Sequence, residues 1–195
     1  VWDSWISWLS AADIKTDGDT GKGLWSNAWY AIRKANLGLE NMENLTDATP
    51  EQRDIIKGQL LFFRAFYHFE LMTYWGGMPY IDKAFSSADK LDYPRLNCHE
   101  TADRIAQDLR EAADLLPADW DKTATGKLTL GKNQLRVSKI TALGYLGKNY
   151  LYAGSPLLNY ESTGNKNFDT EYCRKAAEVF AELLKYVDKQ ETQVK

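Results

Sequence analysis

The sequence contains few of the residues on which metal and redox sites depend. Its 195 residues include two cysteines and two histidines. Cys98 and Cys173 match no metal-binding or redox spacing, so we expect both to be small filler residues and leave a disulfide between them open. His99 lies between Cys98 and Glu100 in a predicted helix, where consecutive side chains diverge by about 100° and cannot converge on one ion. The sequence therefore predicts no metal site.

Long apolar runs, basic clusters and phosphate-binding glycine loops are missing as well. No run of about 18 apolar residues occurs, so no segment is predicted to span a bilayer. Lysines and arginines number 24 against 27 aspartates and glutamates, and they form no basic block. Phosphate recognition needs a concentrated cationic face, so nucleic acid is not expected as a partner. Without a P-loop, dinucleotide fingerprint or zinc motif, no cofactor is expected either.

The sequence also lacks a recognisable catalytic constellation. An activated nucleophile needs a base within hydrogen-bond reach, and His68 is expected to be a structural residue on the same helix as Arg64. Carboxylates are numerous, but they fall on predicted helix faces and loops, where a solvated surface is their usual role. A facing carboxylate pair, as in glycosidases, is not excluded, although no residues point to one. We therefore expect no catalytic residue and no enzyme activity.

Aromatic residues, in contrast, are abundant, with seven tryptophans and eleven tyrosines. Many fall in the stretch LLFFRAFYHFELMTYWGGMPY, residues 60–80. On a helical wheel this stretch is apolar on two opposite sides and leaves a narrow polar strip through Arg64 and His68. Such a helix is predicted to be buried among other helices and to end at the double glycine 76–77, with Pro79 preventing its resumption. The apolar positions are Ile55, Ile56, Leu60, Phe62, Phe63, Phe66, Tyr67, Phe69, Leu71 and Tyr74.

Further helices are predicted from apolar spacing and capping residues. Thr49 is expected to cap the central helix, with Pro50 at its first position. Long connections over 78–97 and 155–167 separate the helices, and no segment shows the two-residue alternation of a strand. The chain is therefore predicted to be all-α. The other predicted helices cover about 1–12, 24–44, 98–116, 133–153 and 168–188.

Two of these helices have the spacing of a tetratricopeptide repeat, an antiparallel helix pair of about 34 residues. Residues 155–171 interrupt the pair. Gly144 and Gly147 each cost about 1 kcal/mol relative to alanine inside a helix, so a neighbouring helix is expected to press close there. One pair cannot bury its apolar face alone, which predicts stacked pairs. The matching positions are Leu146, Gly147, Tyr150 and Gly154 in the first helix, and Ala176, Phe180 and Leu183 in the second.

These motifs resemble the SusD/RagB family of outer-membrane nutrient-binding lipoproteins. The first matching block is FFRAFY over 62–67, followed by Leu71 and by GGMP over 76–79. Together the blocks cover most of residues 25–185, and they occur in the family's order. One departure is Gly147-Lys148, where the family more often has Ala-Arg. The other blocks are Trp29-Tyr30-x-Ile32 with Asn36, Pro94-Arg95 with Glu100, Ile105, Asp108-Leu109 and Leu116-Pro117, and Arg136-Val137-Ser138-Lys139 with Ala142-Leu143, Leu146 and Tyr150-Leu151-Tyr152.

The resemblance implies a SusD-like fold of stacked antiparallel helix pairs, built from interrupted tetratricopeptide repeats with long loop insertions. It implies one helical-repeat domain over 1–195, a fragment of a longer protein whose C-terminal part is absent. It further implies a non-catalytic lipoprotein of the Bacteroidetes outer membrane, attached only through a lipid anchor outside this chain. Such a protein binds oligosaccharides, peptides or other nutrients and delivers them to a SusC-like TonB-dependent transporter. A peptide-binding tetratricopeptide scaffold and an α-toroid glycoside hydrolase remain as alternatives.

An aromatic and acidic cluster near the start of the chain is the candidate ligand site. Sugars present apolar faces of C–H bonds that pack on aromatic rings, while acidic, amide and guanidinium groups bind their hydroxyls. We expect Trp8 and Trp25 to supply rings, and Asp17 and Asp19 to supply polar contacts. Trp29 is expected to be a packing residue. The two aspartates are not followed by the glutamate that closes a calcium loop, so no calcium site is predicted.

Overall fold

A computed structural model describes residues 23–191, except 87 and 91. The helix predicted over 1–12 lies outside the described residues, and so do three of the predicted site residues, Trp8, Asp17 and Asp19. The fourth, Trp25, is described.

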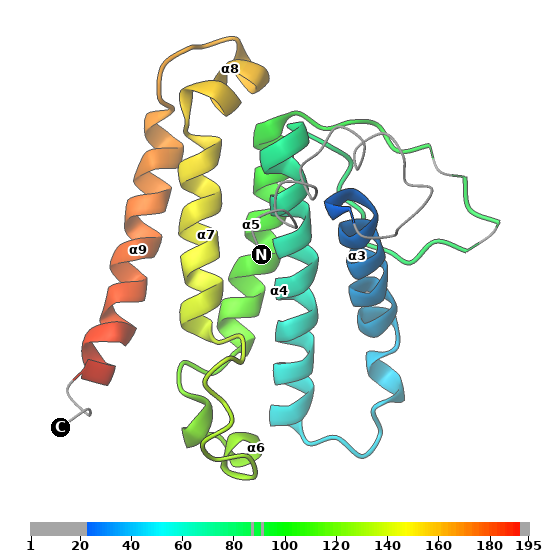
Figure 1. The fold of residues 1–195 in the computed structure, drawn as a ribbon, viewed down its shortest axis with the longest axis vertical. Helices are drawn as coiled ribbons and strands as arrows, with labels where there is room; N and C mark the ends of the chain where they lie inside the picture. Colours follow the sequence, from blue (N-terminus) through cyan, green and yellow to red (C-terminus); the bar gives the residue numbers. More distant parts are fainter. Residues whose placement is uncertain (1–22, 87, 91, 192–195) are drawn as a thin grey trace.

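Long helices stand side by side in a row, and neighbours along the row run antiparallel (Figure 1). α4 packs between α3 and α5, α5 packs against α7, and α7 packs against α9. The described residues contain no strand, so the all-α prediction is confirmed. None of these helices is both long enough and apolar enough to cross a bilayer. The long helices are α3 (Leu24–Glu40), α4 (Pro50–Trp75), α5 (Cys98–Leu115), α7 (Lys139–Ala153) and α9 (Thr170–Glu191).

Shorter helices lie in the connections between the long ones. η1 (Met42–Asn44) extends the end of α3, while η2 (Trp120–Lys122) and α6 (Ala124–Lys127) lie between α5 and α7. α8 (Pro156–Thr163) joins the upper ends of α7 and α9 in Figure 1. The sequence predicts only a polar loop there, because a helix of eight residues is too short for its apolar period to show.

The apolar core has two parts. The larger part fills the space between α4, α5, α7 and α9, and the smaller part lies between α3, α4 and the residues after α4. Each long helix therefore buries its apolar side against its neighbours, as stacked helix pairs require. The smaller part consists of Leu24, Ala28, Ile32, Leu71 and Met78, with Trp25, Trp29, Tyr67, Trp75 and Ile81 packed against it.

The bounds of α4 follow from its terminal residues, as predicted. Thr49 and Gln52 form a reciprocal capping box at its start, with Thr49 N donating to Gln52 Oε1 (2.9 Å). At its end, Gly76 has φ +76°, a conformation that favours glycine. Gly77 is needed for a different reason: a Cβ there would lie 2.3 Å from the Leu96 carbonyl oxygen. The double glycine therefore both stops the helix and lets the connection to α5 pass close by.

The burial of α4 differs from the prediction in detail. Arg64 and His68, which the wheel placed on a polar strip, are both buried. Phe63 and Tyr74, which the wheel placed on an apolar side, are 41% and 48% exposed. The polar side of α4 faces α3 and α5 because partners on those helices satisfy its hydrogen bonds, and this displaces some aromatic residues to the surface.

The predicted repeat pair is confirmed in α7 and α9. A Cβ on Gly147 would lie 2.6 Å from the Phe180 ring, so α9 does press against α7 at this glycine. At Gly144 the nearest atom is a Leu183 methyl at 3.6 Å, which is ordinary contact. The close approach of α9 therefore accounts for a glycine at position 147. It does not account for the glycine at position 144.

The start of α7 differs from the predicted one. α7 begins at Lys139, with Ser138 accepting a hydrogen bond from Thr141 N, and not at Asn133 as expected. Asn133 is buried in the preceding loop, where its amide donates to Asp121 and to the Gly126 carbonyl.

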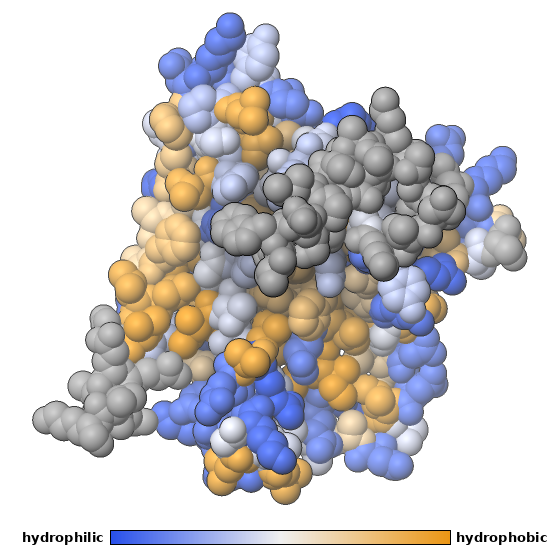
Figure 2. Space-filling model, viewed as in Figure 1, coloured by the Kyte–Doolittle hydropathy of each residue, from blue (hydrophilic) through white to orange (hydrophobic). Residues whose placement is uncertain are grey.

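At the lower end of the molecule, where the segment between α5 and α7 lies, Figure 2 shows apolar side chains among hydrophilic ones. The exposed leucines of the segment are Leu128, Leu130 and Leu135.

Candidate functional site

Three tryptophans meet where α3 begins and α4 ends. Trp25 and Trp29 lie one turn apart on α3, with ring centroids 5.5 Å apart and planes at 76°. The Trp25 ring also meets Trp75, the last residue of α4, at 5.1 Å and 68°. All three are partly exposed and pack on the smaller apolar core. We call these three residues the indole cluster. Edge-to-face packing holds the rings in fixed orientations, and each keeps some surface open to solvent.

A hollow of about 250 Å³ adjoins the indole cluster between α3 and the residues that follow α4. Trp29 lines it, and two cations, Arg33 and Lys83, also face it. Arg33 donates to the carbonyl oxygen of Phe85. The hollow therefore combines aromatic surface with hydrogen-bond donors. Its other lining residues are Ile32, Ile81 and Phe85.

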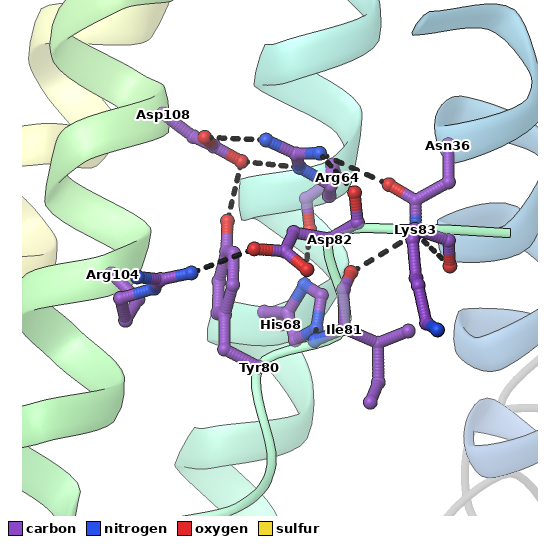
Figure 3. Close-up of polar contacts among 9 residues, drawn as sticks. All are labelled: Asn36, Arg64, His68, Tyr80, Ile81, Asp82, Lys83, Arg104 and Asp108. Carbon is purple, nitrogen blue, oxygen red and sulfur yellow. Dashed lines mark hydrogen bonds and ion pairs between the residues drawn. The ribbon is translucent and has the colours of Figure 1, made fainter. Parts of the chain in front are cut away.

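A buried polar network fixes the wall of this hollow (Figure 3). Asn36 on α3 donates from its amide nitrogen to the carbonyl oxygens of Ile81 and Lys83, both at 3.0 Å. Arg64 on α4 donates to Asn36 Oδ1 (3.1 Å) and to the Asp82 carbonyl oxygen (3.2 Å). Residues 81–83 are thus held against α3 and α4 by side chains far away in sequence.

Arg64 and Asp108 form the centre of that network. Arg64 Nε and Nη2 donate to the two carboxylate oxygens of Asp108 on α5, at 2.6 and 2.7 Å. The Tyr80 hydroxyl donates to the same carboxylate. Burial lowers the pKa of Arg64, but hydrogen bonds with Asp108 more than offset this, so it stays protonated. Burial and the Asp108 charge raise the pKa of Tyr80 well above its ordinary value. The network therefore holds one guanidinium, one carboxylate and one neutral phenol.

His68 connects the network to the indole cluster. Its ring stacks on Tyr80 with centroids 4.0 Å apart and meets Trp29 edge-on at 5.8 Å. His68 Nε2 accepts from the Ile81 backbone N–H (3.0 Å), while Nδ1 donates to the Arg64 carbonyl oxygen (2.8 Å). Burial lowers the pKa of His68 to about 3, so the ring is neutral, as these two hydrogen bonds require. The predicted structural role of His68 is confirmed.

The second histidine and the cysteines also have structural surroundings. His99 Nε2 donates to the Ala153 carbonyl oxygen at 3.0 Å, joining α5 to the end of α7. Cys98 is buried and Cys173 partly buried, and both are free thiols. Within the described part of the chain, no three His, Cys, Asp or Glu side chains converge in a way that could hold a metal ion.

Of the predicted site residues, the structure places Trp25 in the indole cluster, with two partners that the sequence did not single out. From the sequence we predict Trp29 to be a packing residue and assign no role to Trp75. The one-turn spacing of Trp25 and Trp29 gave a local signal that they share a face. No local signal joins them to Trp75, because that contact depends on how α3 and α4 pack.

Comparison with known proteins gives a consistent result. A family model for SusD-like proteins, described as starch-binding and associating with the outer membrane, matches residues 1–151. The SusD-like protein P2 of Formosa agariphila is 30% identical over 131 residues, which is 67% of this chain and 24% of that protein.

Solved structures show the same fold. A SusD-like protein from Bacteroides fragilis has 25% identity and a TM-score of 0.61 over 80% of this chain and 26% of its own. A laminarin-binding SusD-like protein has 24% identity and a TM-score of 0.57 over 69% of this chain and 27% of its own. The chain therefore spans about a quarter of the length of these relatives.

Proposed function

This chain belongs to the SusD-like family, and on that premise we propose that it captures oligosaccharides at the cell surface without catalysing their conversion. The observation that carries the proposal is the indole cluster, with its partly exposed rings beside a hollow that holds Arg33 and Lys83. That a structural relative is a laminarin-binding protein supports a glycan as the ligand class.

The chemistry of the cluster suits a sugar. The C–H faces of a pyranose pack on indole rings, and the rings give up little conformational freedom because their neighbours already fix them. Donors beside the rings can bind hydroxyl oxygens. We propose that Trp25 contacts the ligand, together with Trp8, Asp17 and Asp19 from the segment before α3. A peptide ligand is the alternative that the first experiment must separate.

Catalysis is not part of the proposal. Both histidines are engaged with backbone atoms, His68 with Arg64 and Ile81, and His99 with Ala153. A general base must be within reach of the proton that it takes, and these rings already have structural partners. We propose instead that the bound glycan is passed on intact.

The destination of the glycan is proposed from the family. The family description associates these proteins with the outer membrane, and we propose a lipid-anchored protein that delivers its ligand to a SusC-like TonB-dependent transporter. Affinity purification of the tagged full-length protein from native membranes tests this step. A TonB-dependent transporter should co-purify with it, and its absence under conditions that preserve membrane complexes would contradict the proposal.

A glycan and peptide array tests the binding function. The full-length protein should bind a group of glycans and no peptides. Trp25→Ala and Trp8→Ala should each weaken binding by about tenfold, equivalent to about 1.4 kcal/mol, because each removes a stacking surface. Tyr160→Ala, which alters a half-exposed ring on α8, is the matched control and should bind normally. Unchanged affinity in both tryptophan variants would overturn the site, and binding to peptides alone would overturn the function.

A further inference from the structure

The outward face of α5 carries two hollows that meet at one residue. The first, about 430 Å³, lies between α5 and the connection that leads into it. The second, about 590 Å³, lies where α5 adjoins α7 and α9. Asp103 lines both, so the hollows adjoin along α5, and we call the two together the α5 groove. Volumes of this size are in the range of ligand sites, about 300–1,000 Å³.

An aromatic ring lines each hollow of the α5 groove. Tyr93 lines the first hollow, is 36% exposed, and meets Phe85 edge-on at 5.2 Å. Tyr150 lines the second hollow, and Tyr172 lies beside it with ring centroids 6.1 Å apart. Lys175 lies over both of these rings, at 5.7 and 4.8 Å from their centroids. The rings are therefore held in place by neighbours before any ligand arrives.

Polar groups between the rings are each held by one contact and keep other atoms open. Asp103 accepts from the Tyr172 hydroxyl through Oδ1 (3.0 Å), and Glu100 accepts from Asn97 N through Oε2 (2.9 Å). Arg104 donates from Nη2 to Asp82 (2.7 Å) and lies over the Tyr80 ring at 5.6 Å. Within the described residues, the second carboxylate oxygens of Asp103 and Glu100 and the Nε and Nη1 of Arg104 have no hydrogen-bond partner. These groups are oriented and still available.

The mixture of charges points to a neutral ligand. Charged groups of both signs line the hollows along α5, with Glu100 and Asp103 beside Arg104, and Asp114 near Arg110. A polyanion would meet the carboxylates and a polycation the guanidinium groups, and each would lose affinity to like-charge repulsion. A ligand rich in hydroxyls can donate to the former and accept from the latter. The length of the groove favours a linear chain.

We propose that the α5 groove is a second oligosaccharide-binding site that holds a neutral glycan chain along α5, apart from the indole cluster. The ligand class rests on the proposed function, whereas the location rests on the groove itself. The indole cluster lies on α3 and α4, and the α5 groove lies on α5, α7, α9 and residues 79–96. Tyr93 and Arg104 also reach the first site, because Tyr93 meets Phe85 of the hollow beside Trp29 and Arg104 donates to Asp82. Substitution of Asp103 or Gln107, which line only the α5 groove, should leave the indole cluster intact. A polymer that reaches both sites would gain affinity through multivalency.

Calorimetric titration of the full chain with linear glucose hexasaccharides of β1,3, β1,4 and α1,4 linkage tests this site. Asp103→Asn and Gln107→Ala, which alter residues that line only the α5 groove, should each lower the affinity for the bound hexasaccharide by about fivefold or more. Each should also weaken binding further when combined with Trp25→Ala. Tyr160→Ala and Asp47→Asn, exposed residues outside both sites, are the matched controls and should bind as the unaltered chain does.

The outcomes separate this inference from the proposed function. If Trp25→Ala weakens binding while the two groove variants match the controls, the α5 groove is not a glycan site and the proposed function stands. If the groove variants weaken binding and Trp25→Ala does not, the second site is supported and the indole cluster is excluded. If the unaltered chain binds none of the hexasaccharides and no glycan of the array, both proposals fail.

Discussion

Arg64 and Asp108 form an ion pair that is almost withdrawn from water, with side chains 11% and 10% exposed. Removing two charges from water is costly, and their attraction repays the cost only when the geometry is good and the remaining hydrogen-bonding atoms are satisfied. Here two Arg64–Asp108 hydrogen bonds, the Tyr80 hydroxyl, Asn36 and a backbone carbonyl meet that condition. The pair therefore ties three helices and the connection after α4 to one point.

Asp108→Asn tests how much of the folding stability depends on the buried Arg64–Asp108 pair. The substitution leaves the buried Arg64 charge without its counter-ion, so the free energy of unfolding should fall by about 3–5 kcal/mol in urea denaturation. Glu111→Gln, on the same helix, breaks an exposed pair with Lys57 and should cost less than about 1 kcal/mol. Equal effects of the two substitutions would mean that the buried pair has no special role.

His68 predicts a dependence of stability on pH. Its pKa is lowered to about 3 in the folded chain, against about 6.5 in an unfolded one. Between these two pKa values the imidazole is protonated in the unfolded state and neutral in the folded state. The free energy of unfolding therefore falls as the pH falls below about 6.5, by up to about 1.4 kcal/mol per pH unit. Above that value His68 contributes no pH dependence.

Urea denaturation between about pH 7 and pH 5 measures this slope. His68→Gln should be less stable near pH 7, because it disturbs a packed ring, but its stability should decline less steeply as the pH falls. Since other titrating groups are common to both proteins, the difference between the two slopes isolates His68. Identical slopes would contradict the assignment of a buried neutral imidazole.

At the scale of elements, the contact between α7 and α9 gives a matched pair of substitutions. Gly147→Ala would place its Cβ 2.6 Å from the Phe180 ring, so we expect it to lower the free energy of unfolding by about 1–3 kcal/mol. Gly144→Ala has 3.6 Å of room to Leu183 and should instead stabilise the helix by up to about 1 kcal/mol. Thermal unfolding followed by circular dichroism separates the two signs, and a stabilised Gly147→Ala would contradict the close packing.

Helix positions could be predicted well where local chemistry fixes them. Thr49 and the double glycine 76–77 set the boundaries of α4 through a cap and through backbone freedom, and the structure confirms both. The predicted helix start at Asn133 is wrong, because the Asn133 amide donates hydrogen bonds within the loop around α6. Local spacing cannot reveal partners that arrive from distant segments.

The same limit applies to the candidate site. Trp25 could be named from sequence as a candidate ring of the ligand site, and the structure gives it two indole neighbours. The hollow beside it could not be predicted, because its wall is residues 81–83, which Asn36 and Arg64 hold from two other helices. The polar side of α4 was predicted, but the helices that cover it were not.

At the scale of the whole molecule, the packed helices carry both surfaces that we propose as glycan sites. One is the indole cluster at the junction of α3 and α4, and the other is the α5 groove. Both present rings that neighbouring side chains hold in place, which reduces the entropy lost when a ligand binds. The helix pairs provide this order because each shields the apolar side of the next.

Calorimetric titration of the full-length protein with its array-selected oligosaccharide, followed by chromatography of the same sample, tests the central claim most directly. The account predicts saturable binding, weakened by Trp25→Ala, and recovery of the oligosaccharide at its original length. Shortened products that disappear when one carboxylate is substituted would identify a glycoside hydrolase. Either that result or the absence of binding to any glycan would contradict capture without conversion.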